Sequence, residues 1–154
     1  MSSARPPARL QVRRRYSAPR DLVFRAFTEA DLLEKWFCPA PQVALQVAQL
    51  DLRVGGRYRL LYRFPGDLVV PVVGEYRTIL PPRKLVFTWT WEAPDPFAGV
   101  ETLVTVDLLE KDGGTEVVVT HENFPTEEKM RQHQSGWAAT LERLGAALQN
   151  SKLQ

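Results

Sequence analysis

Strand-like segments separated by turn residues fill the chain from about residue 43 to residue 121, and this pattern most restricts the possible folds. In one segment, Tyr58, Leu60 and Tyr62 share one parity, and arginines occupy most positions of the other. Such alternation indicates a half-buried strand of an antiparallel sheet. The glycine pair at 55–56 and the KDGG sequence lie between segments and predict turns. The expected strands are VALQVAQLDL, RYRLLYRF, LVVPVVGEYRTIL, LVFTWTW, VETLVTVDLLE and TEVVVTHE.

One strand and two short helices are expected before this region. Apolar residues of one parity predict the strand from about residue 9 to residue 16. Two apolar stripes follow in APRDLVFRAFTEADLLEKWF, where we expect Ser17 to cap the first helix and Thr28 to cap the second. Two prolines in CPAP then end the second helix.

A long helix is expected from near Thr126, spanning about 25 residues or ~37 Å at 1.5 Å per residue. Its apolar stripe consists of Met130, Trp137, Leu141, Leu144 and Leu148. No other expected element is long enough to cover the apolar face of the sheet. The sequence therefore predicts an α+β fold, in which a curved seven-stranded antiparallel sheet wraps around the C-terminal helix. We expect residues 1–7 to be a flexible tail and residues 8–154 to form a single domain.

Composition and charge restrict the environment and partners of the chain. Its 154 residues are 44% hydrophobic, and no apolar run approaches the ~20 residues that span a bilayer. The N-terminus lacks a secretory apolar segment and the lone Cys38 cannot form an internal disulfide, so we expect a cytoplasmic protein without membrane insertion. Arginine is concentrated before residue 26, but acidic residues follow closely and the net charge is only +2. Nucleic acid is therefore not an expected partner.

The reactive side chains do not form the usual patterns of metal, cofactor or nucleophile sites. Two histidines and one cysteine without ligand spacing match no zinc pattern. The chain contains no G-x-S-x-G motif, and its two glycine pairs precede a strand or form a hairpin turn instead of opening a helix. We therefore expect no metal and no cofactor, and we assign no catalytic residue.

The order of elements, together with five segments, resembles the START-like (SRPBCC, helix-grip) superfamily, and within it the branch named after the C-terminal domain of the Hsp90 ATPase activator. The segments are SAPRDLVFRAFTEADLLEKWF, DLRVGGRYRL, VVGEYRTILPPRKLVFTW, VTVDLLEKDGGTEVVVTHENF and SGWAATLERLGAAL. The resemblance covers about residues 8–150 and implies a helix-grip fold. Because the superfamily includes lipid carriers, polyketide cyclases and hormone receptors, the resemblance does not fix a function.

Aromatic side chains on the expected inner face, with polar residues beside them, are candidates for binding a ligand under the helix. His121 has inward parity, where a histidine can bind a polar group or transfer a proton. The candidate residues are Trp36, Tyr58, Tyr62, Tyr76, Phe87, Trp89, Trp91, His121, His133, Trp137 and Leu141. Packing in the core is the alternative interpretation for each of them.

Gly136 interrupts the long helix directly before Trp137, although an interior glycine costs about 1 kcal/mol relative to alanine. One interpretation is that the bare backbone lets the contents of a cavity, or a strand side chain, approach the helix. The other is that the glycine relieves crowding against the sheet while Trp137 packs in the core. The residues favour the second interpretation.

Three functions fit these observations. The first is binding of a small hydrophobic or aromatic molecule, such as a lipid, between the sheet and the C-terminal helix. The second is a cavity enzyme of the polyketide cyclase or dehydratase type, with His121 or an inner tyrosine transferring a proton. The third, which the resemblance implies, is an interaction module that stimulates a chaperone ATPase. The sequence favours binding over catalysis and leaves open a chaperone contact and a weak homodimer.

Overall fold

A computed structural model describes residues 8–149 of the chain. The elements are β1 (Ala8–Tyr16), α1 (Arg20–Thr28), α2 (Ala30–Trp36), β2 (Ala44–Leu50), β3 (Arg57–Phe64), β4 (Leu68–Leu80), β5 (Lys84–Trp91), β6 (Glu101–Lys111), β7 (Gly114–Phe124) and α3 (Glu127–Gln149). The predicted order of one strand, two short helices, six strands and one long helix is confirmed. The predicted tail, residues 1–7, lies outside the described residues.

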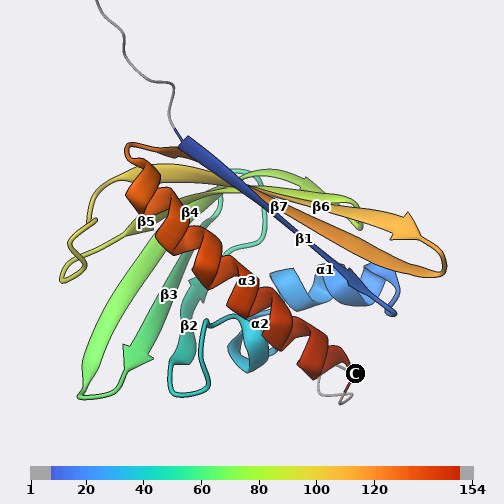
Figure 1. Cartoon of the computed structure of the whole chain (residues 1–154), viewed down its shortest axis with the longest axis horizontal. Helices are drawn as coiled ribbons and strands as arrows, with labels where there is room; N and C mark the ends of the chain where they lie inside the picture. Colours follow the sequence, from blue (N-terminus) through green and yellow to red (C-terminus); the bar gives the residue numbers. More distant parts are fainter. Residues whose placement is uncertain (1–7, 150–154) are drawn as a thin grey trace, which may run out of the picture.

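The seven strands form one antiparallel sheet in the order β1-β7-β6-β5-β4-β3-β2. Strands β2 to β7 each pair with the next strand along the chain. The last strand, β7, also pairs with β1, which places Leu10 opposite His121. In Figure 1 the sheet curves around α3, which crosses its inner face diagonally. The predicted α+β helix-grip architecture is therefore confirmed.

The core lies between the inner face of the sheet and the three helices. On β3, Tyr58, Leu60 and Tyr62 are buried, whereas Arg57 and Arg63 are exposed. This is the alternation that a strand with one buried face requires. The apolar stripe of α3 meets the same core through Trp137, Leu141 and Leu144.

Tyr16 on β1 holds the C-terminal half of α3 against the sheet. Its hydroxyl donates a hydrogen bond to the carbonyl oxygen of Leu141, at 2.7 Å. Burial raises the pKa of Tyr16 well above its usual range, so the hydroxyl keeps its proton. The Tyr16 ring lies against Gly145, where an added Cβ would meet the ring atom Cε1 at 3.3 Å. No described helix, α3 included, is long and apolar enough to cross a membrane.

Both predicted caps of the short helices are wrong. Pro19 is the N-cap of α1, in an extended conformation, so the helix begins after it and Ser17 lies outside. Glu29 is the N-cap of α2. Thr28 instead ends α1, and its hydroxyl donates to the carbonyl oxygen of Phe24 at 2.9 Å. A helical threonine commonly bonds back to the preceding turn in this way, so its side chain is not available to the next helix.

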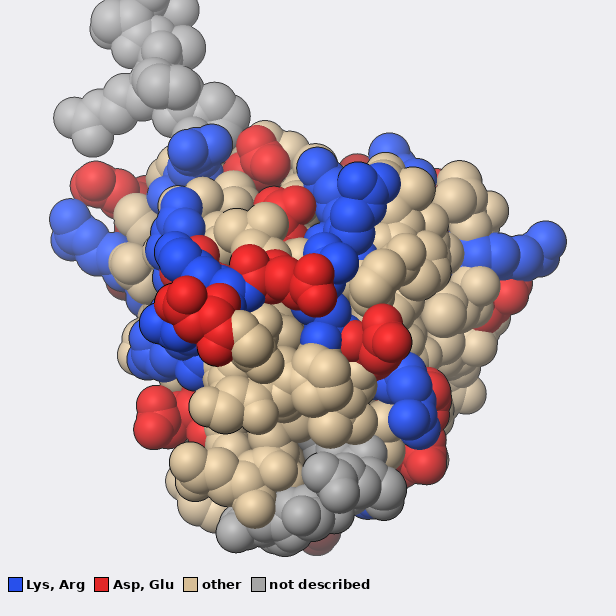
Figure 2. Space-filling model, turned by 90° about the vertical axis from the view of Figure 1, so that its right-hand side faces the viewer, with Lys and Arg blue, Asp and Glu red and all other residues tan. Residues whose placement is uncertain are grey.

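Arginines on and near β1 have acidic partners on neighbouring elements. The ion pairs are Arg13–Glu116, Arg14–Glu142, Arg15–Asp112 and Arg20–Glu110. On the face shown in Figure 2, basic and acidic side chains are interspersed. This face therefore lacks the single-sign stripe that a nucleic-acid backbone requires.

Candidate functional site

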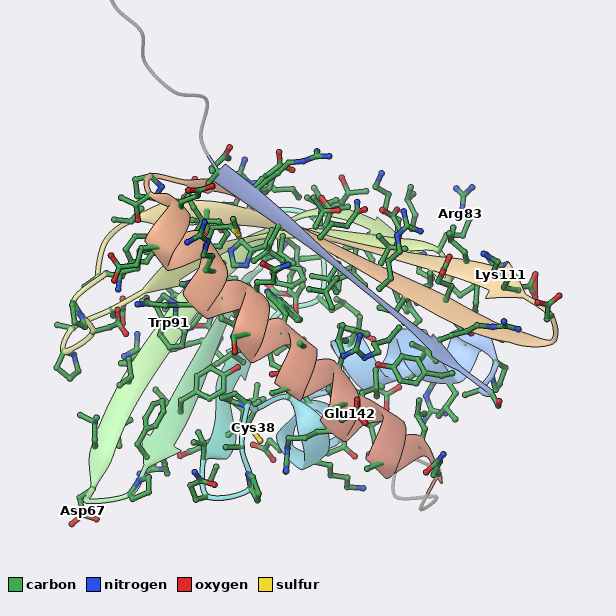
Figure 3. The ribbon with its side chains drawn as sticks, in the orientation of Figure 1. Cys38, Asp67, Arg83, Trp91, Lys111 and Glu142 are labelled. Atoms are coloured by element: carbon green, nitrogen blue, oxygen red, sulfur yellow. The ribbon has the colours of Figure 1, made fainter. Side chains whose placement is uncertain are left out.

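A pocket of about 450 Å³ lies between the sheet and the N-terminal half of α3. Figure 3 shows Trp91 in this region, between the helix and the sheet. The lining residues are Phe37 and Pro39 after α2, Tyr62 and Phe64 on β3, Trp89 and Trp91 on β5, Asp95 and Phe97 in the β5–β6 loop, and Lys129, Gln132, His133, Gly136, Trp137 and Thr140 on α3. Four separate parts of the chain therefore build one concave site.

Aromatic rings form the walls of the pocket and support one another. Trp89 and Trp91 meet edge to face, with ring centroids 5.7 Å apart. Tyr62 lies 5.7 Å from Trp91, and Phe37 lies 5.5 Å from Trp137. Edge-to-face and tilted contacts at these distances are favourable for aromatic rings. The walls are therefore preorganised surfaces that offer ring faces and edges to a ligand.

His133 on α3 is hydrogen-bonded to Trp91 on β5, and both residues line the pocket. The Trp91 indole Nε1–H donates to His133 Nε2 at 2.9 Å. His133 Nδ1 in turn lies 2.8 Å from the carbonyl oxygen of Lys129, one helical turn earlier. Because Nε2 accepts a hydrogen bond, the proton of the neutral ring is on Nδ1, which donates to that carbonyl. This pair links β5 to α3 beside the pocket.

His121 on β7 binds a second tryptophan in the same manner, but deeper. The Trp137 indole Nε1–H donates to His121 Nδ1 at 3.0 Å. His121 Nε2 therefore carries the proton and donates to the Thr102 hydroxyl at 2.7 Å. The Thr102 hydroxyl donates to the carbonyl oxygen of Trp89 at 2.9 Å. Every polar atom of this buried chain has a partner.

Both histidines are neutral at physiological pH. Burial, reinforced by the neighbouring His133, lowers the pKa of His121 well below its usual range. Burial also lowers the pKa of His133, against a smaller opposing contribution from its bond to the Lys129 backbone. Protonation of either ring would turn an acceptor nitrogen into a donor facing an indole N–H. The hydrogen bonds to Trp91 and Trp137 therefore depend on the neutral rings.

A second, much smaller cavity of about 20 Å³ lies next to the pocket, and Trp89 lines both. Tyr58, Tyr76 and Phe87 also line it. The Tyr58 hydroxyl donates to the carbonyl oxygen of Thr88. A space of this size is close to the volume of one water molecule. The small cavity is therefore part of the core and cannot hold a ring-bearing ligand.

The structure separates the eleven candidate residues by depth. Tyr62, Trp89, Trp91, His133 and Trp137 line the main pocket, and Tyr58, Tyr76 and Phe87 line only the small cavity. Trp36 and His121 line neither space, and Leu141 lines a separate groove beside β1. Trp36 is fully buried, and its indole N–H donates to the carbonyl oxygen of Ala26 at 3.0 Å. Within residues 8–149, no three histidine, cysteine, aspartate or glutamate side chains are grouped as a metal site requires.

Several lining residues are absent from the sequence-based candidates. Phe97 lies in the loop between β5 and β6 and lines the pocket. It is the one phenylalanine of the EAPDPFAG segment, and a large apolar residue among turn residues could have indicated a contact with the interior. Thr140 follows Gly136 by four positions, which places both on one face of α3. Phe37 follows α2, and its sequence neighbourhood gives no indication that it reaches the pocket.

The favoured interpretation of Gly136 is wrong about crowding, although Trp137 does pack in the core as that interpretation states. A Cβ built on this residue would meet no atom within 4 Å, so the glycine relieves no crowding against the sheet. Instead, Gly136 lines the pocket between His133 and Thr140. The bare backbone leaves open space at the wall that α3 contributes.

Comparisons with known proteins agree with this architecture. A protein from Chromobacterium violaceum is 25% identical, with a TM-score of 0.81 over 90% of this chain and 94% of that one. A solution structure from Staphylococcus epidermidis is 25% identical, with a TM-score of 0.79 over 100% of this chain and 96% of that one. The AHSA1 protein from Silicibacter pomeroyi is 23% identical, with a TM-score of 0.81 over 94% and 99%, and shows the shared fold.

A comparison with curated proteins finds no match. The family model described as Activator of Hsp90 ATPase homolog 1-like protein matches residues 17–149. This range includes every element from α1 to α3 and every residue that lines the pocket. The chain therefore belongs to the Activator of Hsp90 ATPase homolog 1-like family, and it has the helix-grip fold of the START-like superfamily.

Proposed function

We propose that the chain binds a small hydrophobic, ring-bearing molecule in the pocket under the N-terminal half of α3. The observation that supports this function is the size of the space, about 450 Å³, within an aromatic lining. Known ligand sites have volumes of about 300–1,000 Å³ and mostly apolar walls. A groove of similar size, about 480 Å³, lies between β1 and the C-terminal half of α3, but its lining includes Arg14, Arg15 and Glu142. The aromatic lining therefore distinguishes the pocket under the N-terminal half of α3 as the binding site.

The hydrogen bonds of the walls favour an apolar ligand. The indole N–H groups of Trp91 and Trp137 are already bound to His133 and His121. Both rings therefore offer the ligand their apolar surfaces. A ligand that buries apolar surface against them gains about 25 cal/mol per Å².

The expected affinity is moderate. A ligand of about 20 non-hydrogen atoms at roughly 0.3 kcal/mol per atom gains about 6 kcal/mol, which corresponds to a Kd of some tens of micromolar. Trp89, Trp91 and Trp137 all line the pocket, so their fluorescence reports occupancy. Titration with polycyclic aromatic compounds and fatty acids is therefore a direct test.

A pair of variants locates the binding. Gly136→Leu adds a side chain where the structure has open space and should lower the affinity at least tenfold. Ser135→Leu adds the same side chain at the neighbouring exposed position, outside the pocket lining, and should leave the affinity unchanged. Circular dichroism checks that both variants are folded. Equal binding by the two variants, or no tryptophan response to any compound below about 100 μM, would contradict the proposal.

The two alternative functions have less support. A cavity enzyme would transfer a proton through His121 or an inner tyrosine. His121 is fully buried, does not line the pocket, and uses both ring nitrogens in hydrogen bonds. Tyr62 does line the pocket, but burial raises the pKa of its hydroxyl well above the usual range, which disfavours proton release. Stimulation of a chaperone ATPase is supported by the family description. That function is tested by measuring the rate of ATP hydrolysis by a chaperone after the purified chain is added, with and without a bound ligand. An increased rate would support it.

A further inference from the structure

Two hydroxyl groups at the pocket have no hydrogen-bond partner in the part of the chain that the structure describes. Tyr62 is only 5% exposed and lines the pocket from β3. Thr140 is 7% exposed and lines it from α3. Neither hydroxyl oxygen is among the described side-chain atoms that are shielded from solvent without a partner, so both remain accessible to a ligand in the pocket. A polar atom on the bound molecule would supply the missing partner.

A third unpartnered group is a donor. The Nε1 atom of Trp89 is buried and has no hydrogen-bond partner among residues 8–149. Burial raises the pKa of Tyr62 well above its usual range, so this hydroxyl also carries its proton and can donate. Trp89 Nε1 is shielded from solvent within the wall, so the groups that can donate to a ligand are the two hydroxyls. A ligand atom that accepts a hydrogen bond would give either hydroxyl its partner.

The charge of the lining indicates a neutral acceptor. Among the described lining residues, Lys129 is the only lysine or arginine, and the lining histidine, His133, is neutral with its N–H group already bound to the Lys129 carbonyl oxygen. Lys129 precedes Thr140 by eleven residues, or about 16 Å along the helix axis. Its ammonium group lies 5.4 Å from the centre of the Phe97 ring. A carboxylate near Thr140 would therefore be far from this cation, and burying an unpaired charge is costly.

We propose that the pocket selects neutral ring-bearing molecules with a carbonyl oxygen, and that the Tyr62 hydroxyl donates a hydrogen bond to this oxygen. The inference rests on the proposed function and specifies its ligand class. Tyr62 is the specificity residue, because its ring packs at a tilt against Trp91 while its hydroxyl has no other described partner. A carbonyl oxygen has two lone pairs, so it can accept a second hydrogen bond besides the one from Tyr62.

Three probes of nearly equal size test the proposal. They are 2-acetylnaphthalene, 2-isopropenylnaphthalene, in which a methylene group replaces the carbonyl oxygen, and 2-naphthoate, which carries a charge. Each is titrated into the full chain, Tyr62→Phe and Tyr76→Phe, with tryptophan fluorescence as the readout. Tyr76 is a matched control, because it is also a buried residue whose hydroxyl has no described partner, but it lines only the small cavity.

We expect Tyr62→Phe to reduce the affinity for the ketone, relative to the hydrocarbon, by about three- to tenfold, as for loss of one neutral hydrogen bond. Affinity for the hydrocarbon should change by less than about twofold. Tyr76→Phe should keep the preference of the unmodified chain for the ketone. The naphthoate should bind more weakly than the ketone.

Infrared spectroscopy gives a readout that needs no variant. The carbonyl stretch of the bound ketone should shift to lower frequency than in an apolar solvent, because a hydrogen bond weakens the C=O bond. The inference is overturned if the carbonyl band does not shift, if Tyr62→Phe keeps the preference for the ketone, or if the naphthoate binds most tightly. In each of these cases the pocket still binds ligands, so the proposed function stands. Failure of all three probes to bind the unmodified chain overturns the proposed function as well.

Discussion

Replacing Gly136 by alanine is expected to stabilise the protein, although the residue lines the pocket. Gly136 lies in the middle of α3, and it is not among the glycines with a left-handed backbone. A Cβ built there meets nothing within 4 Å, so the substitution requires no repacking. Alanine therefore gains its full advantage as a helix former.

The expected gain in the free energy of unfolding is about 0.5–1 kcal/mol, the usual difference between glycine and alanine inside a helix. For a domain of this size, 1 kcal/mol raises Tm by about 2–4 °C. Urea unfolding followed by far-ultraviolet circular dichroism resolves this change. The same substitution should leave the affinity for small aromatic probes nearly unchanged, because one methyl group removes little of the pocket volume.

Gly145→Ala is the matched control. This glycine lies in the same helix, but its added Cβ would sit 3.3 Å from the Tyr16 ring, which is held by the bond to Leu141. Crowding should therefore cancel part of the helix-propensity gain, and Gly145→Ala should be less stabilising than Gly136→Ala. The reasoning is refuted if Gly136→Ala lowers the free energy of unfolding, or if the control stabilises the protein more.

Two further predictions concern the buried histidines. Because burial lowers both pKa values, the unfolded chain binds more protons than the folded one from those lowered values up to about 6.5. The free energy of unfolding should therefore be highest above about pH 6.5. Below that pH it should fall by up to about 1.4 kcal/mol per pH unit for each histidine. Urea midpoints measured across this range should depend less on pH in His133→Gln than in the unmodified chain. Thr102→Val removes the acceptor of the His121 Nε2–H and should lower the free energy of unfolding by about 1–3 kcal/mol. Thr105→Val, at a half-buried position of the same strand, should change the unfolding midpoint little, and equal effects would argue against the buried network.

The strands and their inner faces could be predicted because the signal is local. A period of two places Leu85, Phe87 and Trp89 on one face whatever the rest of the chain does, and all three are buried. The turn at Asp112 and Gly113 is equally local, since both residues have positive φ, as the KDGG sequence suggests. The order of elements then leaves few topologies for an antiparallel sheet with one covering helix.

The lining of the pocket could be predicted only in part, because parity gives the face of a residue and not its depth. His121 and Trp89 are both buried on the inner face, yet Trp89 lines the pocket and His121 does not. Which of them meets the open space depends on where α3 crosses the sheet. That crossing is set by contacts between distant segments, such as the bond from Tyr16 to Leu141.

The pairing of β1 with β7 determines when a growing chain can finish its fold. β1 ends at Tyr16, but β7, its strand partner in the described sheet, begins only at Gly114. At a synthesis rate of about 5–20 residues per second, roughly 5–20 s separate the two segments on the ribosome. During this interval β1 has neither its strand partner nor the helix that packs on it. The described sheet is therefore completed only after β7 has been made, when β1 pairs with it.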